Sequence, residues 1–298
     1  MTMPKRRSRL RRILGFALLA IGVIVVVVIL NALAGVLGLK SERLRPEAVS
    51  SLLRPYDRVI KPEGDGPFPT ALLFSGCDGP MDNMDTWAAP LVEKGWAVVV
   101  VDSHTPRGFD DPVLWRLVCF AQLMPGGERA GDVLVSVADA AQMPFVDPDR
   151  LAVIGMSHGG WSIMDLMAFD LPQDLPFNLR AMPQMPARGL GAIRAVILVY
   201  PWCGIANRAR HEPWTQDAPI HFILATDDTI APADDCLEVV GELREAGRAV
   251  TTQIFDGVTH AFDQKKHGSL SALVFDEIAT QTAINGAISV MEPAFTMP

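Results

Sequence analysis

From residue 70 onward, short apolar runs alternate with amphipathic segments. The runs have four to six residues and end at Gly, Asp or Pro, which is typical of strands buried on both faces. They are Thr70–Phe74, Ala97–Val101, Leu151–Ile154, Ala195–Tyr200, Ile220–Ala225 and Val250–Phe255. Helix-like segments lie near Asp85–Lys94, Glu128–Met143, Gly159–Phe169, Ala233–Ala246 and Leu270–Ile288. This alternation predicts an α/β domain with a mostly parallel central sheet and helices on both faces.

The first 39 residues follow a different pattern. Residues 1–12 carry six basic side chains, and Ile13–Leu30 is an uninterrupted run of 18 apolar or Gly residues. About 20 such residues cross a bilayer, whereas the apolar part of a signal peptide has about 7–15. We therefore expect a transmembrane anchor with a cytoplasmic N-terminus and an extracytoplasmic, periplasmic-type body. The alternative is an exported protein whose signal is cleaved at Ala32-Leu33-Ala34.

Three parts follow from these patterns: residues 1–39 as basic N-terminus and anchor or signal, 40–69 as a connector with a first strand near Asp57–Ile60, and 70–298 as the catalytic domain. The Met/Pro-rich Leu171–Gly189 interrupts the alternation, and we expect it, with Pro201–Pro219, to set substrate preference.

The charge and the cysteines narrow the function classes. The chain has 298 residues, 26 basic and 34 acidic, and removal of residues 1–12 leaves 20 basic against 34 acidic residues. So acidic a body is not expected to bind nucleic acid. Cys77, Cys119, Cys203 and Cys236 are far apart and lack the spacing of zinc ligands. We expect buried thiols and no metal, although an exported domain can form disulfides.

The pattern Gly-x-Ser-x-Gly follows the run that ends at Ile154. In Gly155-Met156-Ser157-His158-Gly159 the serine lies between a predicted strand and a predicted helix. This is the context of a nucleophile elbow, a sharp turn that exposes the serine hydroxyl above the sheet. Ser157 is therefore the predicted nucleophile; the alternative is an ordinary turn.

A serine needs a base and an orienting carboxylate, which follow an elbow in the order acid, then histidine. Asp227 and Asp228 come after the run ending at Ala225, and His260 comes after the run ending at Phe255. We predict His260 as the base and Asp228 as the acid, with Asp227 instead bonding backbone amides of its turn.

A tetrahedral oxyanion needs backbone N–H donors. One is expected from the residue after the nucleophile, His158, and one from the small loop Phe74-Ser75-Gly76-Cys77-Asp78-Gly79, where Cys77 is the candidate.

The chain resembles the dienelactone hydrolase-like family of α/β-hydrolases between about Thr70 and Phe262. The similar motifs are F-S-G-C-D-G, D-S-H-T-P-R-G from Asp102, F-V-D-P-D-R-L-A-V-I-G-M-S-H-G-G around Ser157, Asp228 with Pro232, and F-D-G-V-T-H-A-F around His260. The resemblance implies the α/β-hydrolase fold and the triad Ser157, Asp228 and His260, with Cys77 and His158 amides in the oxyanion hole. It also places Arg107 at a recurring position, either near a substrate carboxylate or in a structural ion pair.

The sequence thus predicts a membrane-anchored serine hydrolase that cleaves carboxylic esters or lactones through an acyl-enzyme, without cofactor or metal. Arg107 and Trp202 are candidate substrate contacts. The alternatives are a peptidase or amide hydrolase, since the same triad cleaves both bonds, and a catalytically silent binding protein of this fold. The family's name-giving enzyme has cysteine at the elbow, so Ser157 argues against dienelactone itself as the substrate.

Overall fold

A seven-stranded sheet forms the centre of the body in the computed structural model, which describes residues 5–111, 113–266, 271 and 273–296. The strand order is β1-β3-β2-β4-β5-β6-β7, with β1 antiparallel to β3 and the other pairs parallel. The strands are β1 (Arg58–Ile60), β2 (Phe68–Phe74), β3 (Ala97–Val101), β4 (Val146–Met156), β5 (Ile193–Val199), β6 (Ile220–Ala225) and β7 (Val250–Phe255).

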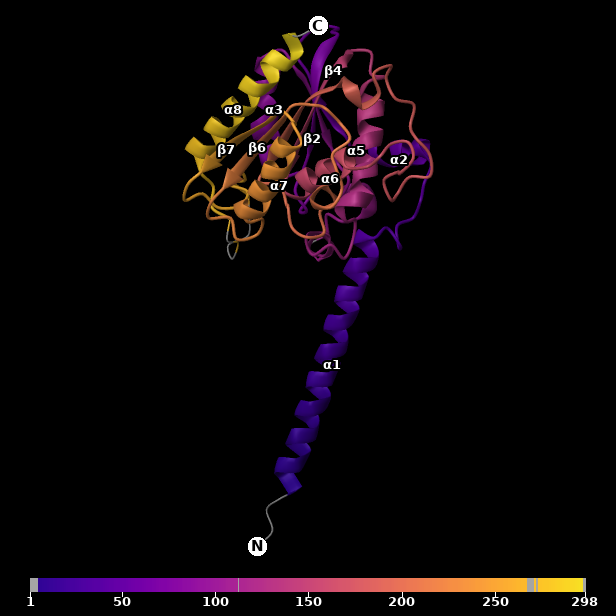
Figure 1. Cartoon of the computed structure of the whole chain (residues 1–298), viewed down its shortest axis with the longest axis vertical. Helices are drawn as coiled ribbons and strands as arrows, with labels where there is room; N and C mark the ends of the chain where they lie inside the picture. The colour runs from indigo at the N-terminus through magenta and orange to yellow at the C-terminus, as the bar shows by residue number, and fades with distance from the viewer. Residues whose placement is uncertain (1–4, 112, 267–270, 272, 297–298) are drawn as a thin grey trace.

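Helices cover both faces of this sheet (Figure 1). The α-helices among the described residues are α1 (Lys5–Val36), α2 (Pro46–Leu53), α3 (Asn83–Glu93), α4 (Leu114–Cys119), α5 (Gly126–Ala140), α6 (His158–Met167), α7 (Ala233–Glu245) and α8 (Glu277–Thr296). Apolar residues of α2, α5, α6 and α7 form one core with one face of the sheet, and those of α3 and α8 form a second core on the other. The expected α/β architecture is confirmed.

Successive side chains of a strand point to opposite faces of the sheet, and apolar residues at both sets of positions make both cores continuous. In β2, Leu72 and Phe74 belong to one core while Ala71 and Leu73 belong to the other. All four side chains are fully buried, so no polar face appears in the sequence of the strand. The parallel pairing brings the carboxyl ends of β2 to β7 to one end of the sheet, where sites of such folds form.

The helix predicted over Leu270–Ile288 starts later than expected. Its first residue, Leu270, lies outside the described residues, and the described residues from Leu273 to Asp276 are not helical. The amides of Val274 and Asp276 bond instead to Thr259 Oγ1 and the Phe262 carbonyl. Asp276 Oδ1 then accepts the N–H of Ala279 and caps α8.

The cysteines form two disulfides, Cys77–Cys119 and Cys203–Cys236, with Cα–Cα distances of 5.0 and 5.1 Å. The expectation of buried thiols was therefore wrong. The error has a physical reason: each pair joins a loop to a helix, 42 and 33 residues away in the chain, and the two segments meet at the carboxyl end of the sheet.

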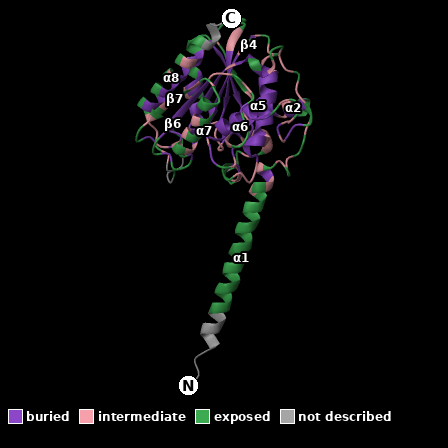
Figure 2. Cartoon of the chain, in the orientation of Figure 1, coloured by how far each residue is buried: buried purple, intermediate pink, exposed green. Residues whose placement is uncertain are grey.

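Helix α1 projects from the body as a single rod, and its surface from residue 11 onward is almost wholly exposed (Figure 2). Arg11–Val36 is long and apolar enough to cross a membrane. The helix is compatible with an anchor or a signal sequence.

Candidate active site

The turn from β4 into α6 holds Ser157 in a strained backbone conformation. Its φ and ψ are 49° and −110°, outside the regions that non-glycine residues normally adopt. The flanking glycines leave room for this turn. A Cβ on Gly155 would lie 2.6 Å from the Gly159 carbonyl carbon, and one on Gly159 would lie 2.2 Å from the Phe74 carbonyl oxygen. This is the geometry of a nucleophile elbow.

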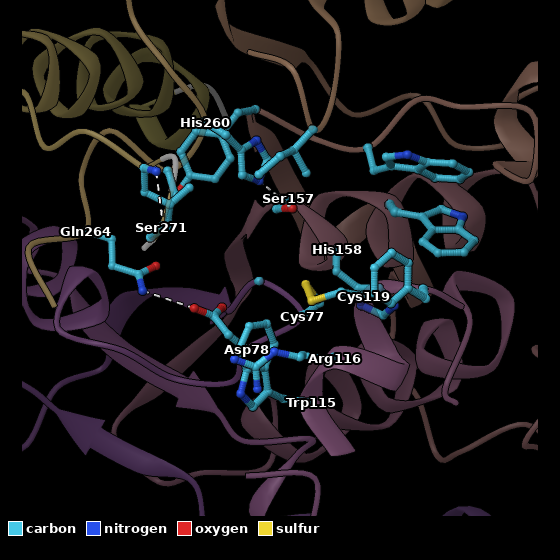
Figure 3. Close-up of a pocket in the computed structure, with 18 of the residues that line it drawn as sticks. Cys77, Asp78, Trp115, Arg116, Cys119, Ser157, His158, His260, Gln264 and Ser271 are labelled. Carbon is cyan, nitrogen blue, oxygen red and sulfur yellow. Dashed lines mark hydrogen bonds between the residues drawn. A yellow bond between two sulfur atoms is a disulfide. The ribbon is translucent and has the colours of Figure 1, made fainter. Parts of the chain in front are cut away.

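An unbroken hydrogen-bond chain joins the three predicted triad residues (Figure 3 shows Ser157 and His260). Asp228 Oδ2 lies 2.6 Å from His260 Nδ1, and His260 Nε2 lies 2.9 Å from Ser157 Oγ. Since an ionised carboxylate only accepts, Nδ1 carries the proton and Nε2 accepts from the serine hydroxyl. All three side chains are buried. In this arrangement an imidazole can take a proton from a serine hydroxyl.

The two adjacent acids have different surroundings. Asp228 is buried, and its second oxygen accepts the N–H groups of Ile230 at 2.9 Å and Ala231 at 2.7 Å. Asp227 is exposed, and its carboxylate accepts the Thr226 hydroxyl at 3.4 Å. The expectation that Asp227 bonds the amides of the turn was wrong, because those amides belong to Asp228.

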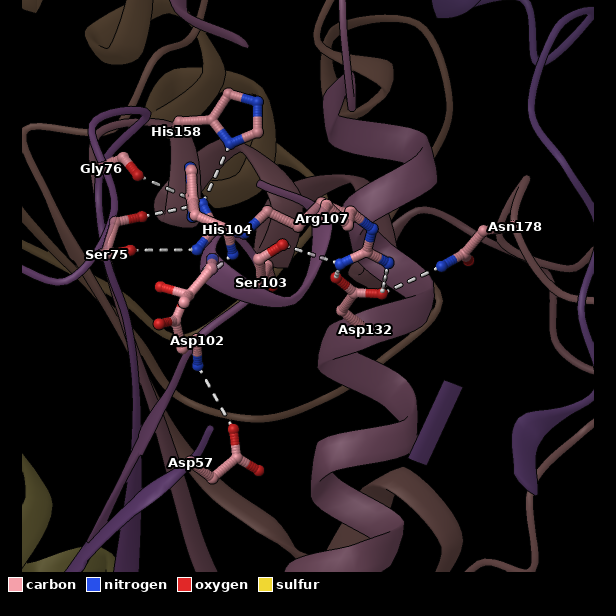
Figure 4. Close-up of polar contacts among 12 residues, drawn as sticks. Asp57, Ser75, Gly76, Asp102, Ser103, His104, Arg107, Asp132, His158 and Asn178 are labelled. Atoms are coloured by element: carbon pink, nitrogen blue, oxygen red, sulfur yellow. Dashed lines mark hydrogen bonds and ion pairs between the residues drawn. The ribbon is translucent and has the colours of Figure 1, made fainter. Parts of the chain in front are cut away.

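The loop after β2 approaches Ser157 closely, since a Cβ on Gly76 would lie 3.8 Å from Ser157 Cβ. Arg129 of α5 fixes this loop. Its Nη1 donates to the Ser75 carbonyl at 2.8 Å and to the Gly76 carbonyl at 3.5 Å (Figure 4 labels Ser75 and Gly76). Because C=O and N–H of a trans peptide point in opposite directions, the Cys77 N–H is aimed away from Arg129. Both candidate oxyanion residues, Cys77 and His158, line the cavity above Ser157.

Arg129 also contacts the His158 ring. It donates to His158 Nδ1 at 3.1 Å, and the arginine is fully buried. Burial, and next the Arg129 charge, hold the pKa of His158 well below its usual value. The ring is therefore neutral at physiological pH. Sequence reasoning missed Arg129, whose only signal is that it is the one basic residue of a helix that also contains Glu128, Asp132 and Asp139.

A cavity of about 690 Å³ opens above Ser157 and His260 (Figure 3). Aromatic side chains form much of its wall: Trp115, Phe120, Trp161, Tyr200 and Trp202. Trp202, a candidate substrate contact, lines this cavity and packs on Trp161 with ring centroids 4.6 Å apart.

Two polar residues in this wall were not predicted. Gln264 Nε2 donates to Asp78 Oδ2 at 3.0 Å on the side of the cavity next to His260 (Figure 3). Burial raises the pKa of Asp78, and the Gln264 hydrogen bond lowers it in part. Asp78 is part of the loop motif identified in the sequence, but nothing in the sequence links it to Gln264.

The Cys77–Cys119 disulfide joins the loop after β2 to the end of α4. Both cysteines line the cavity, and Figure 3 shows them beside His158. Helix α4 was not predicted because a helix of six residues is too short to leave a clear periodic pattern in the sequence.

Arg107 does not lie among the residues that line the cavity, so its assignment as a substrate contact was wrong. Its guanidinium forms two hydrogen bonds of 2.9 Å with Asp132 and donates to the Ser103 carbonyl (Figure 4). Asn178 also donates to Asp132, which is fully buried. Arg107 therefore forms a structural ion pair, which was the alternative interpretation of the T-P-R-G motif.

Replacing Arg107 with methionine is expected to destabilise the fold by about 3–5 kcal/mol, because it leaves the Asp132 charge buried without its ionic partner. KM for neutral and carboxylate-bearing esters should change alike. Denaturant unfolding and steady-state kinetics check both points. The double variant Arg107→Met/Asp132→Asn removes both charges and should lose less stability. A selective rise in KM for the carboxylate-bearing ester would return Arg107 to the substrate site.

Asp57 gives the fold a pH dependence. Burial raises its pKa to about 6, only partly offset by the Asp102 N–H that it accepts, and nearby acids raise it further. The unfolded chain ionises this group at lower pH, so the fold loses stability as pH rises through about 4–6. Asp57→Asn, which keeps the accepting oxygen, should stabilise the protein by about 1–3 kcal/mol at pH 7.5 and by almost nothing at pH 4. Unfolding at both pH values tests this, with exposed Asp65→Asn as the control.

Within the described ranges, no group of three His, Cys, Asp or Glu side chains is arranged to hold a metal ion.

A mostly parallel sheet with an elbow serine, followed by an acid after β6 and a histidine after β7, defines the α/β-hydrolase fold. Within this class, residues 182–295, which include Asp228 and His260, match the dienelactone hydrolase family.

Solved structures share this fold. A putative dienelactone hydrolase from Klebsiella pneumoniae superposes with a TM-score of 0.59, covers 79% of this chain and 91% of its own, and is 16% identical. The esterase Est2 of Thermogutta terrifontis, with propionate bound, has a TM-score of 0.61, coverage of 81% and 90%, and 15% identity.

A curated relative is the acylamino-acid-releasing enzyme of Arabidopsis thaliana, which is 23% identical over 201 residues, or 59% of this chain. The matched part is 25% of that enzyme's length.

Proposed function

We propose that this protein is a serine hydrolase that cleaves carboxylic esters or lactones through an acyl-enzyme. The observation that carries the proposal is the hydrogen-bond chain from Asp228 through His260 to Ser157 at the floor of an open cavity. The dienelactone hydrolase family match and the fold shared with esterases support it.

In the first half-reaction, Ser157 Oγ attacks the ester carbonyl while its proton passes to His260 Nε2. Asp228 stabilises the imidazolium that forms. The Cys77 and His158 amides donate to the developing oxyanion, which is usually the largest single contribution to rate. His260 then gives its proton to the leaving alkoxide. In the second half-reaction, a water loses a proton to His260 and attacks the acyl carbon, which releases the acid and restores Ser157.

A series of 4-nitrophenyl esters of graded acyl length, with the matching 4-nitroanilides, tests the reaction on the full chain. We expect ester kcat/KM to exceed anilide kcat/KM by about 100-fold or more, since the anilide is the poorer leaving group. Absence of turnover of every ester would favour a silent binding protein.

Amide hydrolysis is the second candidate function. The likeness to the Arabidopsis acylamino-acid-releasing enzyme favours it specifically. Turnover of anilides or acyl-peptides at rates comparable to the esters would make it the better description.

We also propose that α1 is a retained anchor, with the N-terminus cytoplasmic and the body outside. The six basic residues before the apolar run support this orientation. The two disulfides agree with it, because such bonds persist in oxidising compartments. A C-terminal alkaline phosphatase fusion in a bacterial host should be active and resist a carbonate wash. A mature N-terminus just after Ala34 would instead indicate a cleaved signal.

A further inference from the structure

The anchor and the cavity lie at the same end of the body. Figure 1 shows α1 meeting the body at the end where α5 begins, opposite the end at which β4 begins. Strand β4 runs from that far end and delivers Ser157 toward the anchor side. The residues after α1 are fixed there, since Ser41 Oγ donates to Glu128 in the first turn of α5 at 2.7 Å.

A loop in the cavity rim touches α1 itself. Gln122 Nε2 donates to the Val28 carbonyl at 3.3 Å, and Asn31 Nδ2 donates to Gln122 Oε1 at 2.9 Å. Lys40 Nζ donates to the Gln122 carbonyl at 2.5 Å. The same loop contains Phe120, which lines the cavity and is 72% exposed.

The residues of α1 that this loop contacts indicate how deep in the membrane the loop lies. A hydrocarbon core of about 30 Å takes about 20 helical residues, so a core that begins at Ile13 ends near Ala32. Val28 and Asn31 then lie at the outer edge of the core. The loop that bonds to them lies at the membrane–water interface, with Phe120 beside it.

Further exposed apolar side chains lie on segments that also contribute residues to the cavity wall. Ile230, after β6, lines the cavity and is 50% exposed. Val113, before α4, and Ile205, after β5, are exposed without lining it. Apolar side chains gathered around an opening in this way mark a surface that meets a membrane or another apolar partner.

We propose that the rim of the cavity rests on the outer leaflet and that the substrates are bilayer-resident long-chain acyl esters. This inference rests on the proposed ester hydrolysis and on the retained anchor. The contacts between the rim loop and α1 select the lipid surface over a protein partner, because they hold the rim at the depth where the lipid begins. An acyl chain can then pass from the leaflet into the aromatic cavity without crossing water.

The kinetic test uses the full chain in phosphatidylcholine vesicles with two esters that release the same leaving group. The probes are 4-methylumbelliferyl oleate, which resides in the bilayer, and 4-methylumbelliferyl acetate, which is water-soluble. The rim variant Val113→Gln/Ile205→Gln is compared with Val59→Gln/Ile254→Gln, which makes the same exchanges on the two edge strands. The rim variant should lose about fivefold in oleate kcat/KM through KM, with acetate turnover unchanged. The edge-strand variant should match the parent on both esters.

A second measurement is independent of activity. Phe120→Trp and Val59→Trp each add one indole, and the vesicles contain phosphatidylcholine brominated near the headgroup. The indole at position 120 should show additional quenching, and the one at position 59 should show none.

Each outcome has one meaning. Acetate turnover without oleate turnover, equal loss in both double variants, or no quenching at position 120 would overturn the membrane-facing rim and leave the proposed hydrolase standing. Failure to hydrolyse either ester would overturn the proposed function, and the substrate class with it.

Discussion

Replacing Ser157 with alanine is expected to lower ester turnover by several orders of magnitude and to abolish covalent labelling by a fluorophosphonate probe. The reason is that Ser157 Oγ is the hydroxyl hydrogen-bonded to His260 Nε2 in the cavity.

Ser136→Ala is the matched control. Ser136 is also buried, but it lies on α5, and its hydroxyl has no hydrogen-bond partner within the described part of the chain. This variant should keep both its labelling and its activity. Labelling that survives in Ser157→Ala would show that another residue is the nucleophile.

Asp228→Asn is expected to lower kcat by about 10⁴-fold, as the equivalent change does in the serine protease precedent. An asparagine can still accept the Ile230 and Ala231 amides through one oxygen. Its NH₂ group cannot accept a hydrogen bond from His260 Nδ1–H, so the ring is held in the wrong tautomer. The fold should therefore survive while the proton transfer fails.

Asp227→Asn makes the identical exchange one residue away, on an exposed side chain that does not contact His260. We expect kcat and stability close to those of the parent. Steady-state kinetics on both purified variants, with thermal unfolding to confirm that each is folded, gives the comparison. The opposite ranking would make Asp227 the acid.

The central strands and the order of the triad could be predicted from sequence for a physical reason. Strands such as β3 are buried on both faces and appear as unbroken apolar runs, which few other structures produce. Parallel strands bring their carboxyl ends together, so residues 157, 228 and 260 were expected to meet despite their separation in sequence.

Other features depend on tertiary contacts that have no local pattern. Arg129 lies in a helix whose sequence does not indicate which residue faces the loop after β2. The short helix α2 forms because Val49 and Leu53 pack into the core beside α5, not because its eight residues are strongly helical. The cysteine pairs likewise depend on which loop meets which helix, and the spacing of the cysteines does not reveal this.

The Cys77–Cys119 bond couples the position of the proposed amide donor to the position of the cavity wall. Cys77 belongs to the loop for which we propose an amide donor to the oxyanion, while Cys119 ends the helix that borders the cavity. A substitution that shifts α4 to admit a bulkier acyl group would also displace the amide donor. We therefore expect adaptation to new substrates through cavity residues away from both disulfides, such as the exposed side chain of Ile230.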